Sequence, residues 1–103
     1  VRGRPAVEAL RQRDEAEAEL YLGNIQAMQN DLDGATVHYR NAIEAAPDRV
    51  DLHRTLAQHL ARAGAYEEAI EVLAHALELA PENQALRQTL EVWRRELGAM
   101  GTD

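Results

Sequence analysis

Apolar residues recur every three or four positions along most of the chain, which is the spacing of one face of an α-helix. Leu52, Leu56 and Leu60 form one such face, with Ala57 beside it. Gly64 follows, and glycine ends helices because it takes the left-handed conformation without steric cost. A second apolar face then consists of Ala69, Ile70, Leu73, Ala76, Leu77 and Ala80. The pattern predicts two helices joined by a short turn, which makes them antiparallel.

The same pattern occurs twice, because residues 16–49 align with residues 50–83 without a gap. Pro47 and Pro81 lie 34 residues apart at the ends of the two halves. Each should follow the end of a helix, since the residue before a proline is pushed out of helical geometry. Small residues align with small ones and large residues with large ones. The sequence therefore predicts a helical repeat.

Turn and capping residues support the same boundaries. Asn30 takes the place that Gly64 has in the second half, and asparagine is the next best residue for a left-handed helix end. Asp48 and Asn83 follow the two prolines, and their side-chain oxygens are expected to cap the helices that come next.

The period and its residues resemble the tetratricopeptide repeat, marked W-x2-L-G-x2-Y, then A-x3-F, then P. The first half matches this motif with Leu22, Gly23, Ala35, Tyr39 and Pro47. The second half matches it with Leu56, Ala57, Leu60, Ala69, Leu73 and Pro81. Glu19, Gln26 and His53 depart from it. The resemblance implies an all-α fold, a right-handed α-solenoid of antiparallel helix pairs.

The residues after the second half begin like a third repeat and then diverge. Leu86 and Leu90 continue the apolar face, but Glu91 stands where packing needs a small residue. We therefore expect a capping helix that ends at Gly98, with Trp93 covering the edge of its seam. The expected single domain, 1–103, comprises a partial helix (1–15), two repeats (16–49 and 50–83), the capping helix (84–98) and a tail (99–103).

The N-terminal residues allow two interpretations. Asp14 and Glu17 have the spacing of a capping box, which predicts a helix start near Glu15. The alternative is one continuous helix from Ala6 to Met28.

Two repeats and one cap leave the N-terminal end of the stack open. We expect residues 6–13 to fold back over it, or a second copy of the chain to cover it across a two-fold axis as a homodimer. Because the chain begins with Val1 rather than methionine, it is expected to be a piece of a longer protein.

The amino-acid composition excludes several classes of function. A net charge of −7 argues against binding to nucleic acid or anionic membranes, and no apolar run approaches the length of a membrane span. The chain has no cysteine and no serine, its four histidines lack metal-ligand spacing, and no glycine-rich phosphate loop occurs. We therefore expect no catalytic residue, cofactor or metal site, and no enzyme activity. The sequence does not determine the cellular compartment, and we favour the cytoplasm over the periplasm.

A second stripe of side chains follows the first helix of each pair, away from the packed face. In the resembled family such helices line a concave groove that commonly docks peptides. Arginine binds carboxylates with two parallel hydrogen bonds, so the expected ligand is an extended peptide with acidic residues and one apolar anchor. The expected peptide-binding residues are Leu20, Tyr21, Asn24, Met28, Arg54, Thr55, Gln58, Arg62, Gln88 and Arg95.

Two other functions are weighed against this one. Some members of the resembled family grip the C-terminal carboxylate of a peptide with Lys, Asn and Arg side chains. The corresponding places here hold Leu20, Asn24, Thr55, Ala85 and Thr89, of which only Asn24 fits, so that mechanism is disfavoured. The main alternative is a self-association or interdomain packing module within a larger, potentially enzymatic, bacterial protein.

Overall fold

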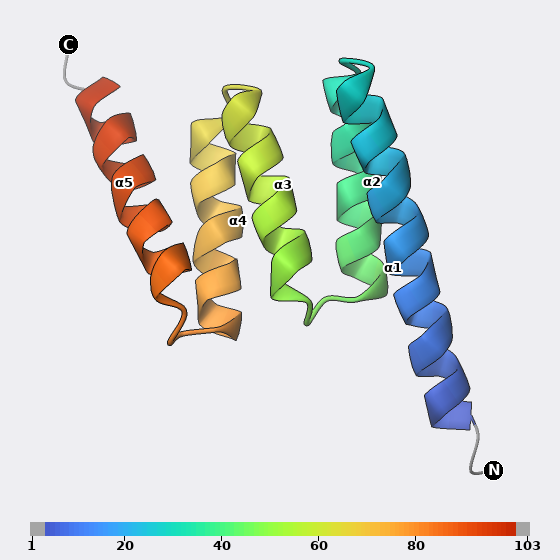
Figure 1. Ribbon diagram of the computed structural model, residues 1–103. Helices are drawn as coiled ribbons and strands as arrows, with labels where there is room; N and C mark the ends of the chain where they lie inside the picture. Colours follow the sequence, from blue (N-terminus) through green and yellow to red (C-terminus); the bar gives the residue numbers. More distant parts are fainter. Residues whose placement is uncertain (1–3, 101–103) are drawn as a thin grey trace. The chain divides into compact units, whose positions relative to one another are not determined.

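The computed structural model describes residues 4–100, which form five helices (Figure 1). The chain divides into two compact units, residues 1–52 and residues 53–103, and each is described by itself. The fold is an all-α helical repeat, as expected. The helices are α1 (Arg4–Met28), α2 (Leu32–Ala45), α3 (Val50–Arg62), α4 (Tyr66–Leu79) and α5 (Gln84–Met100).

The turns after α1 and α3 have the same backbone geometry. Asn30 has a φ of 63° and Gly64 a φ of 87°, so both residues are left-handed. In each turn the next amide donates to a carbonyl five residues earlier, over 2.8 Å in the first turn and 2.9 Å in the second. This bond satisfies a carbonyl that the helix end would otherwise leave unpaired. The predicted helix ends at Asn30 and Gly64 are confirmed.

The ends of α2 and α4 also match each other. Ala46 (φ −143°, ψ 72°) and Ala80 (φ −136°, ψ 71°) leave helical geometry directly before Pro47 and Pro81. The cause is steric, because the proline ring disfavours the helical conformation in the residue that precedes it. The prolines therefore end both helices as predicted.

One of the two predicted caps is correct. Asn83 Oδ1 accepts a hydrogen bond from the Leu86 amide at 3.1 Å and caps α5. The corresponding prediction for Asp48 is wrong by one residue, since α3 begins at Val50 and Arg49 directly precedes it.

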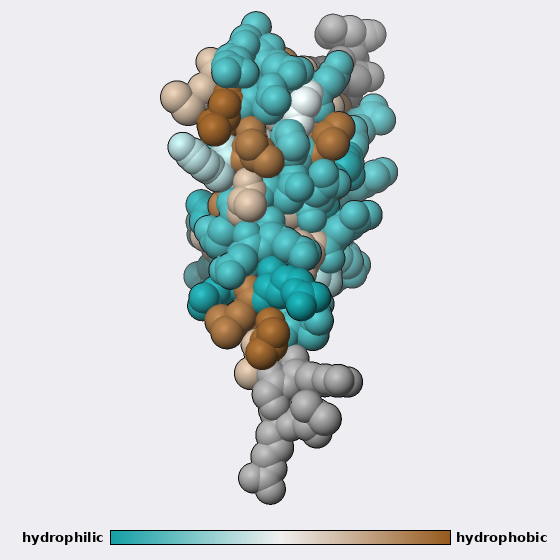
Figure 2. Space-filling view, turned by 90° about the vertical axis from the view of Figure 1, so that its right-hand side faces the viewer, coloured by the Kyte–Doolittle hydropathy of each residue, from teal (hydrophilic) through white to brown (hydrophobic). Residues whose placement is uncertain are grey.

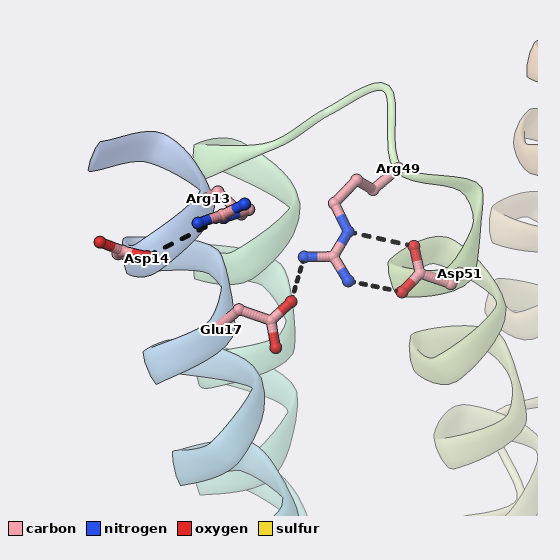
Figure 3. A network of polar contacts seen from close by, with 5 residues as sticks. All are labelled: Arg13, Asp14, Glu17, Arg49 and Asp51. Atoms are coloured by element: carbon pink, nitrogen blue, oxygen red, sulfur yellow. Dashed lines mark hydrogen bonds and ion pairs between the residues drawn. The ribbon is translucent and has the colours of Figure 1, made fainter. Parts of the chain in front are cut away.

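Arg49 instead joins two helices through its guanidinium group (Figure 3). It binds Asp51 in the first turn of α3 with two hydrogen bonds of 3.2 and 2.7 Å, and it binds Glu17 of α1 at 2.5 Å. The bonds with Arg49 lower the pKa of the Asp51 carboxyl, and Asp51 and Glu17 together raise the pKa of Arg49. All three groups are partly solvated, so each pair contributes little, about 0–1 kcal/mol. Their effect is to orient the chain between Pro47 and α3.

The helix start predicted near Glu15 is wrong, because α1 is continuous from Arg4 to Met28. Asp14 does not begin a helix there, and its carboxylate lies 4.0 Å from the Arg13 guanidinium (Figure 3). The spacing of a capping box is also the spacing of neighbours on a helix surface, and no proline interrupts this stretch. The structure therefore shows the continuous alternative, and residues 6–13 do not fold back.

The predicted helix end at Gly98 is wrong as well. α5 continues to Met100, and residues 101–103 of the expected tail lie outside the described residues. A glycine ends a helix by taking a positive φ, and among the described glycines only Gly64 has one. Glycine alone lowers helix stability by about 1 kcal/mol, which does not stop a helix.

The first two helices lie close together at Gly23. A Cβ at this position would lie 2.7 Å from Cδ1 and Cε1 of Tyr39, so only glycine fits without movement. The Tyr39 ring is buried, and its hydroxyl donates a 2.7 Å hydrogen bond to Asn24 Oδ1. Fully buried alanines at Ala16, Ala35 and Ala42 continue this contact region of small residues.

A polar contact lies beside this seam, where the repeat motif prefers a large residue. Glu19 Oε2 is 2.7 Å from His38 Nδ1 and 3.3 Å from Asn41 Nδ2, so α2 supplies both partners of an α1 carboxylate. The hydrogen bond with His38, with a further contribution from Asn41, lowers the pKa of Glu19 from its ordinary value.

Replacing Gly23 with alanine should destabilise the protein. The clash with Tyr39 costs about 1–3 kcal/mol, whereas alanine gains about 1 kcal/mol in helix propensity. We expect a net loss of about 1 kcal/mol, which thermal unfolding would record as a drop of about 4–8 °C. In a Tyr39→Leu background the loss should shrink, because the ring is absent.

Gly98→Ala is the matched control for this prediction. A Cβ at Gly98 meets nothing within 4 Å, so alanine should leave the melting temperature unchanged or raise it. If both variants raise the melting temperature, Gly23 does not set the distance between α1 and α2.

Replacing Glu19 with glutamine should lower stability at neutral pH by about 1 kcal/mol. Because the folded pKa of Glu19 is lowered, its contribution is complete above the ordinary value of 4.5 and is lost as the pH falls through the folded value. Denaturant unfolding at several pH values should therefore show the two proteins converging at acidic pH. Glu44→Gln, on the exposed side of α2, should differ little from the parent at any pH.

Candidate functional site

A hollow of about 640 Å³ lies where α3, α4 and α5 meet in the second unit. It opens to solvent on one side and combines two aromatic residues with polar and charged ones. Its lining consists of Gln58, Ala61, Arg62, Tyr66, Trp93 and Glu96.

The packing of α3 determines which of its residues reach this hollow. Leu56 and Leu60 are buried, so the opposite side of the helix faces solvent. Gln58 and Arg62 lie one turn apart on that side, and Arg54 lies one further turn before Gln58. All three are exposed, and they form a row of hydrogen-bonding side chains along α3.

The aromatic residues come from the other two helices. Tyr66 begins α4 directly after the turn at Gly64, and the left-handed glycine fixes where this helix starts. Trp93 lies on α5, which is anchored by the buried residues Leu86 and Leu90. Both rings are half-buried and contribute to the wall of the hollow.

The hollow combines side chains that can bind a ligand. The rings of Tyr66 and Trp93 can contact an apolar group, while their polar atoms accept or donate hydrogen bonds. Arg62 supplies a positive charge and Glu96 a negative one, so the two sides of the hollow differ in charge. Across residues 4–100, no group of three or more His, Cys, Asp or Glu side chains is placed to hold a metal ion.

Two of the predicted binding residues, Gln58 and Arg62, line this hollow, and Arg54 shares their side of α3. Thr55, Gln88 and Arg95 do not belong to its lining. Glu96 lies 34 residues after Arg62, so the repeat period gives Glu96, and not Arg95, the place of Arg62 on α5.

The sequence reasoning did not assign Ala61, Tyr66, Trp93 or Glu96 to a site. Of these four residues, only Glu96 could have been found from the sequence, because the 34-residue period places it at the position of Arg62. Tyr66 and Trp93 are large residues at packing positions, and the pattern predicts such residues as core or seam.

The other predicted residues belong to the first unit. Leu20 is half-buried against the cluster of Ala16, Ala42 and Leu52, and the amide oxygen of Asn24 accepts the hydroxyl of Tyr39. The Leu20 side chain therefore contributes to the interior of the unit, whereas Asn24 is exposed and bonds to Tyr39 from the surface. Tyr21 and Met28 lie on one side of α1 and are 60% and 87% exposed.

The fold defines a class of protein, a short α-helical repeat with an open hollow in its second unit. The tetratricopeptide repeat model matches residues 26–91, and the chain belongs to the tetratricopeptide repeat family. Members of this family are generally interaction modules without catalysis, and this chain is a protein–protein interaction module.

One similar solved structure is the N-terminal domain of stress-induced protein-1 from C. elegans. It shares 30% sequence identity with this chain and superposes with a TM-score of 0.64. The similarity covers 71% of this chain and 57% of that domain, so this chain spans little more than half the length of the domain that it matches. Comparison with curated proteins gives no match. Within the described residues, no helix is both long enough and apolar enough to cross a membrane.

Proposed function

We propose that the second unit binds an extended peptide that carries one apolar side chain followed by acidic residues. The observation that carries this proposal is the composition of the hollow between α3, α4 and α5. Half-buried Tyr66 and Trp93 supply aromatic surface, and Gln58 and Arg62 supply hydrogen bonds beside it. An apolar side chain of the peptide inserts between the rings, because aromatic contact area is what anchors most protein ligands.

The acidic part of the peptide extends along α3. Arg54 and Arg62 lie eight residues apart on one side of this helix, about two turns, so their guanidinium groups project in the same direction. Guanidinium groups remain charged and bind carboxylates through two parallel bonds. Glu96 supplies a negative charge on α5, so we assign the carboxylates to the α3 side.

The affinity should be modest. The hollow is open, and exposed ion pairs contribute only about 0–1 kcal/mol each. We therefore expect a dissociation constant in the micromolar range at best, which corresponds to about −8 kcal/mol. Binding should weaken as salt is added, because the pairs are solvent-exposed.

The proposal can be tested with Trp93, the only tryptophan of the chain, as a fluorescent reporter. The probe is a blocked peptide of eight residues with one leucine followed by glutamates, compared with a peptide in which glutamine replaces every glutamate. We expect the acidic peptide to bind at least about tenfold more tightly, which corresponds to about 1.4 kcal/mol. Arg54→Glu combined with Arg62→Glu should reduce acidic-peptide binding below detection while helicity and melting temperature stay nearly unchanged.

Arg94→Glu combined with Arg95→Glu is the matched control. It makes the same change in charge with two exposed residues that do not line the hollow. This control should keep at least half of the parent affinity. Equal losses in both double variants would mean that net charge, and not the hollow, determines binding.

A further inference from the structure

Exposed apolar side chains are arranged differently in the two units. Figure 2 shows one face of the first unit, with apolar patches near its top and bottom and hydrophilic side chains between them. In the second unit, the half-buried rings of Tyr66 and Trp93 line one hollow together with a positive and a negative side chain, those of Arg62 and Glu96. The hollow therefore offers apolar contact and both signs of charge in one place.

The two charges of the hollow are not used by the fold to neutralise other charges. Neither Arg62 nor Glu96 takes part in an ion pair with another described residue. Their own helices supply no partner either, because the positions three and four residues away from each of them hold no opposite charge. Both side chains are exposed, so both charges are available to a ligand.

Helix stability accounts for the charge of Arg62 but not for that of Glu96. Arg62 is the last residue of α3, and the partial negative charge of a helix C-terminus favours a positive side chain there. Glu96 lies one turn before the end of α5, where the same partial charge opposes a carboxylate. The carboxylate of Glu96 is therefore stabilised neither by an ion pair nor by its helix, which makes it a candidate for binding.

An aromatic ring lies beside this carboxylate. Trp93 precedes Glu96 by three residues, so the two side chains are neighbours on one face of α5, and both line the hollow. A positive group is attracted by a carboxylate and also by the face of an indole ring, through a cation–π interaction. α5 therefore presents side by side the two kinds of side chain that bind a cation.

Negative charge on this side of the hollow extends past Tyr66. Tyr66 also lines a second hollow of about 450 Å³, between the start of α4 and Leu97 of α5, whose charged side chains are Glu67 and Glu68. These two carboxylates stabilise the first turn of α4, and they also add to the negative potential around Glu96. The potential across the first hollow therefore changes from positive at α3 to negative at α4 and α5.

We propose, on the basis of the function proposed above, that the peptide bound by the hollow has mixed charge, with a basic residue on the opposite side of its apolar anchor from the acidic residues. The basic side chain binds Glu96 and contacts the ring of Trp93. Opposite charges on the two sides of the anchor then match the opposite charges across the hollow. Glu96 and Trp93 therefore determine specificity, because they favour this peptide over one that is acidic or neutral on both sides of the anchor.

The test compares two blocked peptides through the fluorescence of Trp93. One peptide has lysines before its leucine and glutamates after it, and the other has glutamines in place of the lysines. We expect the chain to bind the lysine-containing peptide at least about threefold more tightly, since an exposed ion pair and a cation–π contact both add to its affinity.

Glu96→Gln should remove most of this preference and leave binding of the glutamine-containing peptide unchanged. Glu96→Lys should reverse the preference, because like charges then meet. Both changes are at an exposed position, so helicity and melting temperature should stay nearly the same. Glu91→Gln is the matched control, since Glu91 is also exposed on α5 but lines neither hollow, and this variant should keep the preference.

Two outcomes would overturn the mixed-charge ligand. Equal binding of both peptides by the parent chain would show that the basic residue is not recognised. Equal losses of preference in Glu96→Gln and Glu91→Gln would mean that the net charge of the chain attracts the lysines. Neither outcome affects the proposed function, as long as the glutamine-containing peptide binds in a manner that depends on Arg54 and Arg62. Lysine-peptide binding that depends on Glu96 but not on these arginines would support the basic-residue site and contradict the proposed function instead.

Discussion

The contact between α1 and α2 depends on the absence of a side chain at Gly23. The Tyr39 ring occupies the space that a Cβ would take, so the distance between the helices is set by a glycine against an aromatic ring. Other contacts follow from this distance. The Tyr39 hydroxyl reaches Asn24, and His38 reaches Glu19, only because the two backbones lie close together. Polar contacts in this unit are consequences of steric fit and do not replace it.

Features that depend on local backbone chemistry could be predicted from the sequence. Asn30 and Gly64 end helices through their own φ angles, and Pro47 and Pro81 act on the residue directly before them. Features that depend on competition between interactions could not be predicted. A residue pair with the spacing of a capping box is equally compatible with the middle of a helix, and only the environment of Asp14 decides between them. Gly98 likewise permits a helix end but does not require one.

The candidate site shows the same division. The solvent-facing positions of Gln58 and Arg62 could be predicted, because the buried leucines of α3 determine which side of that helix faces solvent. Tyr66 and Trp93 could not, since a half-buried aromatic residue has the same pattern whether it fills a core or lines a hollow. Leu20 shows the converse, because a position expected in the groove contributes its side chain to the interior of the first unit. Hydrophobic spacing identifies a face but not the depth at which a side chain lies.

The repeat separates residues that determine the fold from residues whose side chains face solvent. At the turns, different residues give one geometry, as the φ angles of Asn30 and Gly64 show. At one exposed position of the repeat the residues differ in chemistry. The 34-residue period places Met28, Arg62 and Glu96 at this position, and these residues are apolar, basic and acidic. Packing restrains the turns but places no demand on a side chain in solvent. The fold therefore defines which positions face solvent, and the chemistry of each surface has to be derived from its own residues, as the aromatic hollow with two charges in the second unit shows.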